Sequence, residues 1–397
     1  MITQNFFWVG EQDPSLRVFD IIMNTEFGTS YNSYLLKGQN NEFILFETVK
    51  NAFGDEYINK LKDIVGDLSN ITHVVVNHTE PDHAGSLVKL ITMLDDITII
   101  ASAAAIKFLG GITNLQFKSI KASEQKPLNL AGYTLHFKSV PFLHWPDTIY
   151  TYIEEEKILV TCDSFGAHYS SDRILFSEHT EQEVKDFNTA YEYYFNMIMG
   201  PFKSYVLNAL EKIKDLDIDY VCPGHGLVFD KSNFEYYKNL YRTWSTPTFT
   251  KEGVTIVYVS AYGYTKCLAN KIAEGIMQQG INVELFDMGT SKFEDVIASI
   301  GKCKGLLVGS PTILGDALPP IWQLLISLNP VIHKGIIAGC FGSSGWSGEA
   351  TINIAQRLSQ LNFKQPLEPF NVYFKPSETD EENAVQFGID FANGLNS

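Results

Sequence analysis

Residues 78–83 read His-Thr-Glu-Pro-Asp-His and follow the β-branched run His73–Asn77, which predicts a short buried strand. Most of these six side chains are of types that bind metal ions. In an extended segment His78, Glu80 and Asp82 would share one side, and His83 would turn to the other. Such a split suits a loop that holds two metal ions side by side. A polar loop that happens to carry two histidines is the alternative interpretation.

Three later positions place a metal-binding residue type directly after a predicted strand. His144 lies in Pro-Phe-Leu-His-Trp-Pro-Asp, Asp163 lies in Thr-Cys-Asp-Ser-Phe-Gly, and His225 lies in Cys-Pro-Gly-His-Gly. A single histidine or aspartate at a strand end is usually structural. Together the three predict candidate ligands at one edge of a sheet, where loops gather into a site.

The first 250 residues mix predicted strands and helices, without an internal repeat. The predicted strands cover residues 30–36, 42–47, 133–140, 149–154, 157–161 and 220–222. The predicted helices cover residues 57–65, a segment from about 86, and 188–213, with a break at Gly200-Pro201.

From Gly253 onward, strands and helices alternate strictly. Strands are expected at 254–259, 282–286, 305–308, 336–340 and 369–374, and helices at 267–278, 293–300, 321–326, 349–360 and 381–395. This alternation predicts a parallel sheet covered on both faces, of the size of a doubly wound, flavodoxin-like domain. The turn-rich stretch Ser245–Thr248 suits a linker, so we expect domains at 1–248 and 249–397.

Composition narrows the possible classes of function. The chain has 397 residues and a formal net charge of −16, which disfavours nucleic acid as a partner. No apolar run approaches the ~20 residues that span a bilayer, and no signal peptide is evident. The five cysteines include no C-x-x-C pair, so a rubredoxin-like site or zinc ribbon is not expected. These features predict a cytoplasmic protein without a membrane segment.

The ligand pattern resembles that of the metallo-β-lactamase superfamily, which implies an αββα sandwich over about residues 1–245. Glu80 stands where the hydrolases of that superfamily have a second histidine. This exchange is the signature of the flavodiiron proteins, whose pattern H-x-E-x-D-H…H…D…H is matched at every position. The resemblance implies one iron at His78, Glu80 and His144, a second at Asp82, His83 and His225, and Asp163 as the bridge.

The donor types agree with this assignment. Imidazoles mixed with carboxylates, without thiolate, suit iron or manganese better than a metal that prefers soft ligands. The negative charge of Glu80 stabilises Fe(III), and therefore favours redox chemistry. Zinc has no redox chemistry, so a hydrolase would gain nothing from the exchange.

Three loops of the second domain are typical of a flavin site. The first, Ser260–Thr265, joins a strand to a helix and places hydroxyls and backbone N–H groups at a helix N-terminus, as a single phosphate requires. It matches neither a Walker loop nor G-x-G-x-x-G. The other loops follow later strands, and the last resembles the flavodiiron FMN loop. The predicted FMN residues are Ser260, Tyr262, Gly263, Tyr264, Thr265, Ser310, Pro311, Thr312, Gly342, Ser343, Ser344, Gly345, Trp346, Ser347 and Gly348.

The two sites together predict a flavodiiron oxidoreductase that reduces dioxygen to water, nitric oxide to nitrous oxide, or both. Electrons would pass from an external donor, such as a rubredoxin or flavin reductase, through FMN to two irons. The resemblance implies a head-to-tail homodimer or a dimer of dimers. The sequence leaves open the preferred gas, the donor and the choice between dimer and tetramer.

Two other interpretations remain open. One is a metallo-hydrolase with an appended flavodoxin-like domain, and the other is an electron carrier with a metal-free first domain. Residues beyond the ligand set are assigned less firmly. His168 follows Asp163 closely, and it or the pair Tyr193 and Tyr194 could contact the metal centre. The histidines expected to be structural or exposed are His73, His136, His179 and His333.

Overall fold

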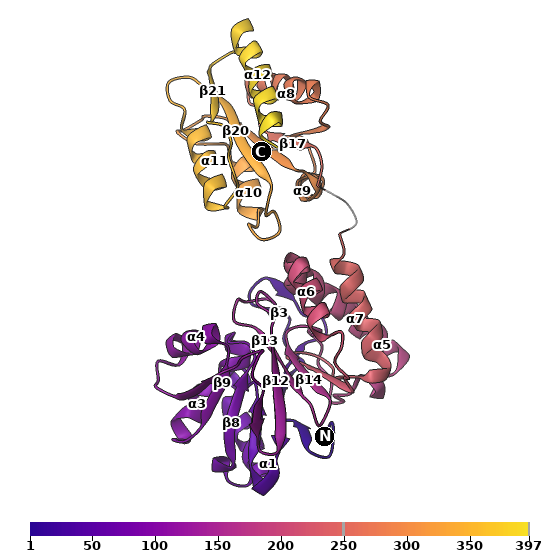
Figure 1. Cartoon of the computed structure of the whole chain (residues 1–397). Coiled ribbons are helices and arrows are strands. Elements are labelled where there is room, and N and C mark those ends of the chain that lie inside the picture. The colour runs from indigo at the N-terminus through magenta and orange to yellow at the C-terminus, as the bar shows by residue number, and fades with distance from the viewer. Residues whose placement is uncertain (248–250, 396–397) are drawn as a thin grey trace. The chain divides into compact units, whose positions relative to one another are not determined.

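The computed structural model describes residues 1–247 and 251–395, and these fall into two compact units, Met1–Thr246 and Pro247–Ser397 (Figure 1). The domain boundary expected between residues 248 and 249 lies outside the described residues. No helix in the described ranges combines the length and apolar character needed to cross a bilayer.

The first unit contains two six-stranded sheets packed face to face. The first sheet has the order β1 (Phe6–Trp8), β6 (Tyr34–Lys37), β7 (Phe43–Phe46), β8 (Ile71–Val76), β9 (Thr98–Ala101) and β10 (Lys118–Lys121). The second has the order β11 (Leu128–Leu130), β12 (Tyr133–Ser139), β13 (Ile149–Ile153), β14 (Ile158–Cys162), β15 (Tyr220–Pro223) and β16 (Phe229–Asp230). Apolar side chains such as Phe46, Val75, Phe137 and Val160 fill the space between the sheets.

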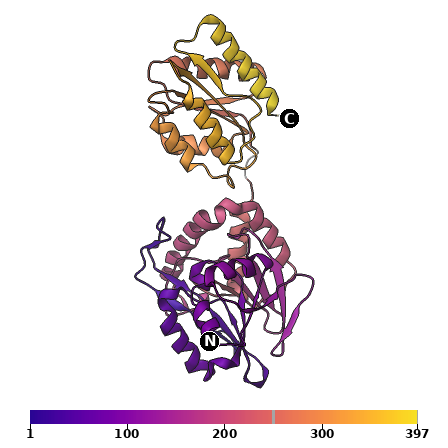
Figure 2. The ribbon, with the colours of Figure 1, turned by 90° about the vertical axis from the view of Figure 1, so that its left-hand side faces the viewer.

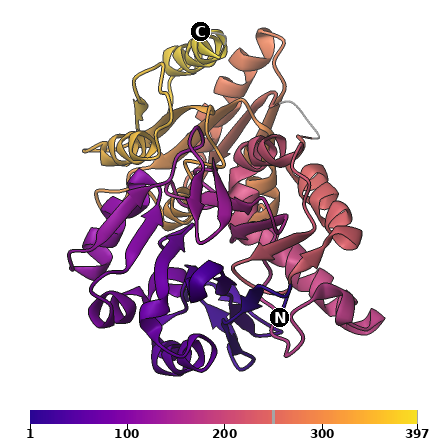
Figure 3. The same cartoon turned by 60° about the horizontal axis from the view of Figure 1, so that its bottom comes forward.

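Helices cover the outer face of each sheet, which completes an αββα sandwich (Figures 1 and 3). The first sheet packs against α1 (Gly54–Val65), α3 (Leu87–Met93) and α4 (Ala103–Thr113). The second packs against α5 (Glu181–Tyr194), α6 (Lys203–Ile213) and α7 (Lys231–Ser245). The predicted fold class of this unit is therefore confirmed.

Three local differences from the predicted elements affect the site. The strand expected at residues 30–36 is split into β5 (Thr29–Tyr31), which pairs with β2 (Glu11–Asp13), and β6. The cause is Asn32, whose side-chain amide donates to the carbonyls of Pro223 and Gly226 at 2.9 and 3.0 Å. These bonds tie the break in the strand to the loop that carries His225.

The extended path expected for residues 78–83 ends at Glu80. Pro81 opens a short helical turn, α2 (Pro81–Ala84), because its fixed φ suits the first position of a helix. The third difference lies in the helix expected at 188–213. It begins at Glu181 as α5, behind a capping box formed by Thr180 and Glu183, and continues through a π-helical turn at Phe195–Met199. A 3-10 turn at Gly200–Phe202 then leads into α6, where the Gly-Pro break was expected.

The second unit is a parallel sheet with helices on both faces (Figures 1 and 2). The strand order is β18 (Val283–Asp287), β17 (Val254–Tyr258), β19 (Gly305–Pro311), β20 (Ile337–Ser344) and β21 (Phe370–Tyr373). One face carries α8 (Tyr264–Gln278) and α12 (Glu378–Gly394), and the other carries α9 (Phe293–Lys302), α10 (Pro319–Ser327) and α11 (Glu349–Gln360). This is the flavodoxin-like order, in which ligands bind where the order reverses, between β17 and β19.

Candidate metal centre and flavin site

All seven predicted metal ligands meet at one end of the sandwich. His78 and Glu80 follow β8, Asp163 follows β14, and His225 follows β15. His144 lies on the connection between β12 and β13, and Asp82 and His83 lie on α2. The side chains form two groups, His78–Glu80–His144–Asp163 and Asp82–His83–His225. We call them the first and second donor groups.

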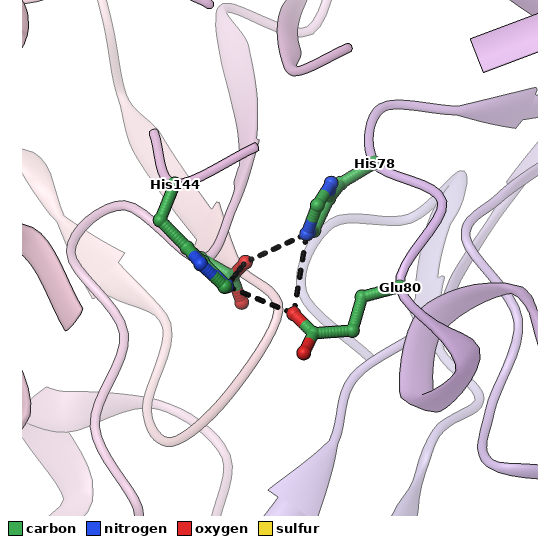
Figure 4. A group of neighbouring side chains, drawn as sticks. His78, Glu80 and His144 are labelled. Atoms are coloured by element: carbon green, nitrogen blue, oxygen red, sulfur yellow. Dashed lines mark hydrogen bonds and ion pairs between the residues drawn. The ribbon is translucent and has the colours of Figure 1, made fainter. Parts of the chain in front are cut away.

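The first donor group surrounds one oxygen of Asp163. Glu80 Oε2 lies 3.3 Å from His78 Nε2 and 2.8 Å from His144 Nε2 (Figure 4). Asp163 Oδ2 lies 3.4 and 3.5 Å from the same two nitrogens. Four donors therefore converge on a volume of the size of one metal ion.

The other oxygen of Asp163 faces the second donor group. Asp163 Oδ1 lies 2.9 Å from His83 Nε2 and 3.6 Å from His225 Nε2. Asp82 Oδ2 lies 3.0 Å from His225 Nε2 and 3.5 Å from His83 Nε2. Asp163 thus has the position that a bridging carboxylate requires, between two sets of donors.

The centre is dry except on one side. His78, His83, Asp163 and His225 are fully buried, whereas the side chains of His144 and Glu80 are 18% and 13% exposed. Solvent and small molecules therefore reach the centre past the first donor group.

Buried charges of opposite sign perturb the ionisation of the donors. Burial opposes protonation of His78 and His83, but the surrounding carboxylates outweigh it and hold both pKa values well above the usual range. Burial also opposes ionisation of Asp163, yet His83 and His78 hold its pKa well below the usual range. A metal ion would displace the protons from these imidazoles, so binding would release protons.

The donor set fits metal ions by a further criterion. Among the described residues, both carboxylate oxygens of Asp82 and Asp163 Oδ2 are buried without a hydrogen bond, although imidazole nitrogens lie near them. Unsatisfied buried carboxylate oxygens are costly. Donors that point at a common centre rather than at one another are typical of metal ligands.

Outer contacts fix the orientation of the donors. Asp147 accepts from the Thr79 backbone N–H at 2.8 Å and lies 3.2 Å from His78 Nδ1. His225 Nδ1 donates to the Ser30 carbonyl at 2.6 Å. A Cβ on Gly224 would lie 2.6 Å from the His83 ring, so glycine is needed for the two loops to approach. Such partners set the tautomer and the ring orientation of ligating histidines.

Sequence patterns alone did not single out three of the residues near the centre. Asp147 lies three positions after His144, which was a usable signal. Glu47 is buried beside His83 and Cys162 and accepts from the Asn77 backbone N–H at 2.8 Å. Asp20 lies on the exposed turn between β3 (Val18–Phe19) and β4 (Met23–Asn24), where lost solvation and the neighbouring Glu80 raise its pKa to about 6. Nothing local in the sequence marks Glu47 or Asp20.

Tyr194 and His168 border the centre, but Tyr193 faces elsewhere. The Tyr194 hydroxyl donates to Asp163 Oδ1 at 3.1 Å. The His168 ring centroid lies 4.9 Å from that of Tyr194 and 5.1 Å from that of His225, and its Nδ1 bonds to the Thr29 hydroxyl. The Tyr193 hydroxyl instead accepts from the Asn24 backbone N–H. The histidines expected to be structural or exposed lie outside both donor groups: His73, His136, His179 and His333.

The predicted FMN loops enclose a cavity of about 370 Å³ at the carboxyl ends of β19 and β20. Its lining includes many of the predicted residues: Tyr262, Tyr264, Pro311, Thr312, Ser343, Ser344, Gly345 and Trp346. Ile313, Leu314 and Phe374 line it as well and were not predicted. Ile313 and Leu314 directly follow the predicted residues Pro311 and Thr312, and this position could have indicated that they line the cavity.

The remaining predicted residues support the loops rather than line the cavity. The Ser260 hydroxyl accepts from the Lys266 backbone N–H, and Gly263 has a φ of +85° that opens α8. Thr265 contacts Ser343 through their hydroxyls, and the Ser310 hydroxyl accepts from the Leu318 N–H. Gly342 packs against Ser310, while Ser347 and Gly348 precede α11.

The rim of this cavity is exposed and apolar, with two aromatic side chains and one leucine. Tyr262 is 82% exposed, Trp346 is 89% exposed and Leu314 is 98% exposed. An open slot with apolar walls and backbone N–H groups at a helix start fits a flat ring with a phosphate tail.

Comparison with known proteins agrees with both domains. Residues 29–226 match the family described as ODP family beta lactamase, and residues 256–388 match the flavodoxin family. The chain is 40% identical to the flavo-diiron protein FprA2 of Clostridium acetobutylicum, over 99% of each chain. It is 30% identical to the anaerobic nitric oxide reductase flavorubredoxin of Salmonella paratyphi A, over 99% of this chain and 81% of the relative.

Solved structures lead to the same family. The rubredoxin oxygen:oxidoreductase of Desulfovibrio gigas aligns with a TM-score of 0.63 and 26% identity, over 100% of this chain and 98% of the other. The flavodiiron protein of Giardia intestinalis aligns with a TM-score of 0.61 and 27% identity, over 100% and 96%. The chain belongs to the flavodiiron protein family.

Proposed function

We propose that this protein is an FMN-dependent di-iron oxidoreductase that reduces dioxygen to water, nitric oxide to nitrous oxide, or both. The observation that carries the proposal is the placement of Asp163, with one carboxylate oxygen toward each donor group, beside Glu80. We propose His78, Glu80 and His144 as ligands of one iron and Asp82, His83 and His225 as ligands of the other, bridged by Asp163. When bound, FMN supplies electron transfer, and the iron pair supplies binding and reduction of the diatomic.

The chain's own residues prepare the centre for that chemistry. Asp147 and the Ser30 carbonyl hold two imidazoles in one orientation, so the donor nitrogens need no reorganisation. The buried second donor group excludes water from one side. The partly exposed Glu80 and His144 leave room for a small substrate on the other. The Tyr194 hydroxyl, whose oxygen lies 3.1 Å from Asp163 Oδ1, donates its proton in a hydrogen bond to that carboxylate.

Further properties are part of the same proposal. The electrons come from an external donor of the rubredoxin or flavin reductase type. The predicted loop residues hold FMN, with Tyr264, Thr312 and Trp346 among those that line the cavity and Ser260, Gly263 and Thr265 among those that support the loops. A head-to-tail dimer would bring the flavin of one subunit to the irons of another. The five cysteines are all free thiols, which supports a reducing compartment such as the cytoplasm.

Anaerobic reduction of protein loaded with iron and FMN tests the proposal. The reduced protein is mixed separately with dioxygen and with nitric oxide, and gas consumption is followed together with flavin absorbance. We expect consumption of at least one gas, coupled to flavin oxidation. Glu80→His restores the hydrolase-like pattern and should abolish turnover, whereas Glu56→Gln, in the first turn of α1, should not.

Two outcomes would favour the alternatives. Stoichiometric zinc with ester hydrolysis and no gas consumption would indicate a metallo-hydrolase. Full reductase turnover in Glu80→Ala would indicate that the donor groups are not used, and would favour an electron carrier.

A further inference from the structure

Two helices beside the metal centre bring a row of tyrosines and one tryptophan together. Tyr191 and Tyr194 lie on α5, and Tyr237, Tyr241 and Trp244 lie on α7. Their spacings of three and four residues place the members from each helix on one face. Because the two faces pack together, the rings form a continuous series in the core.

This series begins at the metal centre. Tyr194 donates to Asp163 Oδ1 at 3.1 Å, and its ring lies against Gly166, where an added Cβ would be 3.4 Å from Tyr194 Cζ. The Tyr241 hydroxyl accepts from the Phe165 backbone N–H at 2.8 Å, two residues beyond Asp163. The inner end of the series therefore lies on the Asp163 loop.

From Tyr241 the series leads outward by two branches. Trp244, which is partly exposed, lies 6.4 Å from Tyr241 and 5.8 Å from Tyr191 between ring centroids, so it can be reached from either tyrosine. Tyr191 lies 5.4 Å from Tyr241 and 5.0 Å from Tyr237, and Tyr237 lies 5.2 Å from Tyr236. Tyr236 is 59% exposed, so the second branch ends in solvent.

Packing alone does not account for the hydroxyl of Tyr191, which links the two ends of the series. The same cluster contains phenylalanines that fill space equally well, among them Phe165, Phe187 and Phe195. A buried hydroxyl costs free energy unless it is well bonded. The hydroxyls of Tyr194, Tyr241 and Tyr237 are well bonded, the last to Asn188 Oδ1 at 2.6 Å, whereas the Tyr191 hydroxyl reaches the Tyr237 carbonyl only at 3.5 Å. What tyrosine and tryptophan share, and phenylalanine lacks, is a side chain that can be oxidised by one electron.

We propose that Tyr194, Tyr241, Tyr191, Tyr237, Tyr236 and Trp244 form a path that carries oxidising equivalents from the metal centre to the surface. This rests on the proposed function, because dioxygen reduction to water takes four electrons. When the donor is exhausted, oxygen reduction stops part-way, and partly reduced oxygen oxidises nearby side chains. Short steps between oxidisable rings let that oxidation leave the buried centre before it damages the donor groups.

The electrons and protons balance along this path. One electron moves inward along the path to the partly reduced oxygen at the centre, which takes it together with one proton from water. Two such transfers take oxygen from the peroxide level to water. At the outer end, the phenol or indole proton of the oxidised surface residue passes to water. Each buried phenol loses an electron and regains one from its outer neighbour, so it ends unchanged. The surface radical takes a hydrogen atom from a low-molecular-weight thiol, and two of the resulting thiyl radicals join as a disulfide.

The test uses holoenzyme with iron and FMN, given limiting dithionite and then excess dioxygen in the presence of catalase. Freeze-quenched samples are examined by electron paramagnetic resonance, and oxidised residues are located by peptide mass spectrometry. We expect a tyrosyl or tryptophanyl radical. We also expect oxidised side chains at Trp244 and Tyr236, which we call the oxidation marks. Added glutathione should remove both marks and form glutathione disulfide.

Two variants separate the branches. In Tyr241→Phe the oxidation marks at Trp244 and at Tyr236 should both be lost, because the path to each runs through Tyr241. In Tyr191→Phe the mark at Tyr236 should be lost and the mark at Trp244 should remain. Tyr57→Phe is the matched control, because Tyr57 is equally buried, bonds to Ser33, and lies in the other core of the first unit. Iron and FMN content establish that each variant is folded.

Dioxygen consumption, recorded in the same samples, separates failure of the inference from failure of the proposed function. Consumption without radical or marks would overturn the path and leave the function standing. Marks that persist unchanged in Tyr241→Phe, or that lie only on the highly exposed Trp346 and Tyr262, would show oxidation by diffusing species and would also overturn it. A holoenzyme that consumes no dioxygen would contradict both the proposed path and the proposed reduction of dioxygen.

Discussion

The metal centre and the flavin site use opposite solutions to the problem of holding a cofactor. The donors of the metal centre are almost all buried and are fixed by further hydrogen bonds. The flavin cavity is a slot between loops, with Tyr262 and Trp346 largely in solvent.

The difference follows from what each cofactor needs. The carboxylates among the metal donors repel one another, and the donors as a set gain most from a dry, preorganised setting. A flavin ring must be reached by another redox partner, so part of its edge has to remain accessible. We therefore expect changes at the metal centre to have large effects, and changes at the flavin rim to have small ones.

The largest effect should come from Asp163→Asn. The amide cannot supply two anionic oxygens, so both donor groups lose their shared ligand. We predict that bound iron is lost and that turnover falls by at least about a hundredfold. Metal analysis and gas consumption measure this, with Asp55→Asn at the exposed start of α1 as the control. Unchanged FMN content would show that the flavin site is independent, and a parallel loss of FMN would contradict the contrast between the sites.

Asp147→Asn should have the next largest effect. The substitution keeps the shape but weakens the hold on His78 Nδ1 and the Thr79 N–H. We predict about a tenfold to hundredfold loss of iron affinity, measured by competition with a chelator. Affinity within twofold of the wild-type value would show that the backbone alone preorganises the donors.

The buried carboxyl of Glu47 should make the stability of the metal-free protein depend on pH. Burial, only partly offset by His83, raises the pKa of Glu47 from 4.5 to about 7. Between these values the folded chain binds more protons than the unfolded chain, so stability falls as pH rises. We predict that urea unfolding at pH 5 and pH 8 shows a decrease about 2 kcal/mol larger in the wild type than in Glu47→Gln. Equal decreases in the two proteins would contradict this.

The smallest effect should come from Trp346→Ala. The indole covers one side of an open slot, and its loss should weaken FMN binding by about fivefold, or about 1 kcal/mol. Quenching of FMN fluorescence on titration measures this, and Trp346→Phe should retain most of the affinity. Iron content should not change. A loss of more than about a hundredfold would show that the site is less open than the exposed rim indicates.

Much of this arrangement could be predicted from the sequence, since ligands follow strand ends and the strand–helix alternation of the second unit is regular. The features that could not be predicted depend on long-range contacts. Asn32 breaks a strand because its amide meets carbonyls near His225, almost two hundred residues away. Glu47 and Asp20 likewise lie near the metal centre only because the fold brings distant segments of the chain together. The sequence did not predict α7. Its buried face is formed largely by aromatic side chains, and its other face mixes polar and apolar residues, so the helical pattern is weak.

The partial exposure of Glu80 and His144 also bears on how metal ions enter and leave. Whatever admits a diatomic substrate also admits a chelator, and the first donor group lies on that side. The second donor group lies behind it, with Asp82 and His225 almost inaccessible. Metal exchange should therefore proceed in order, with rapid release from the first group and slow release from the second, and a chelator chase should resolve two phases.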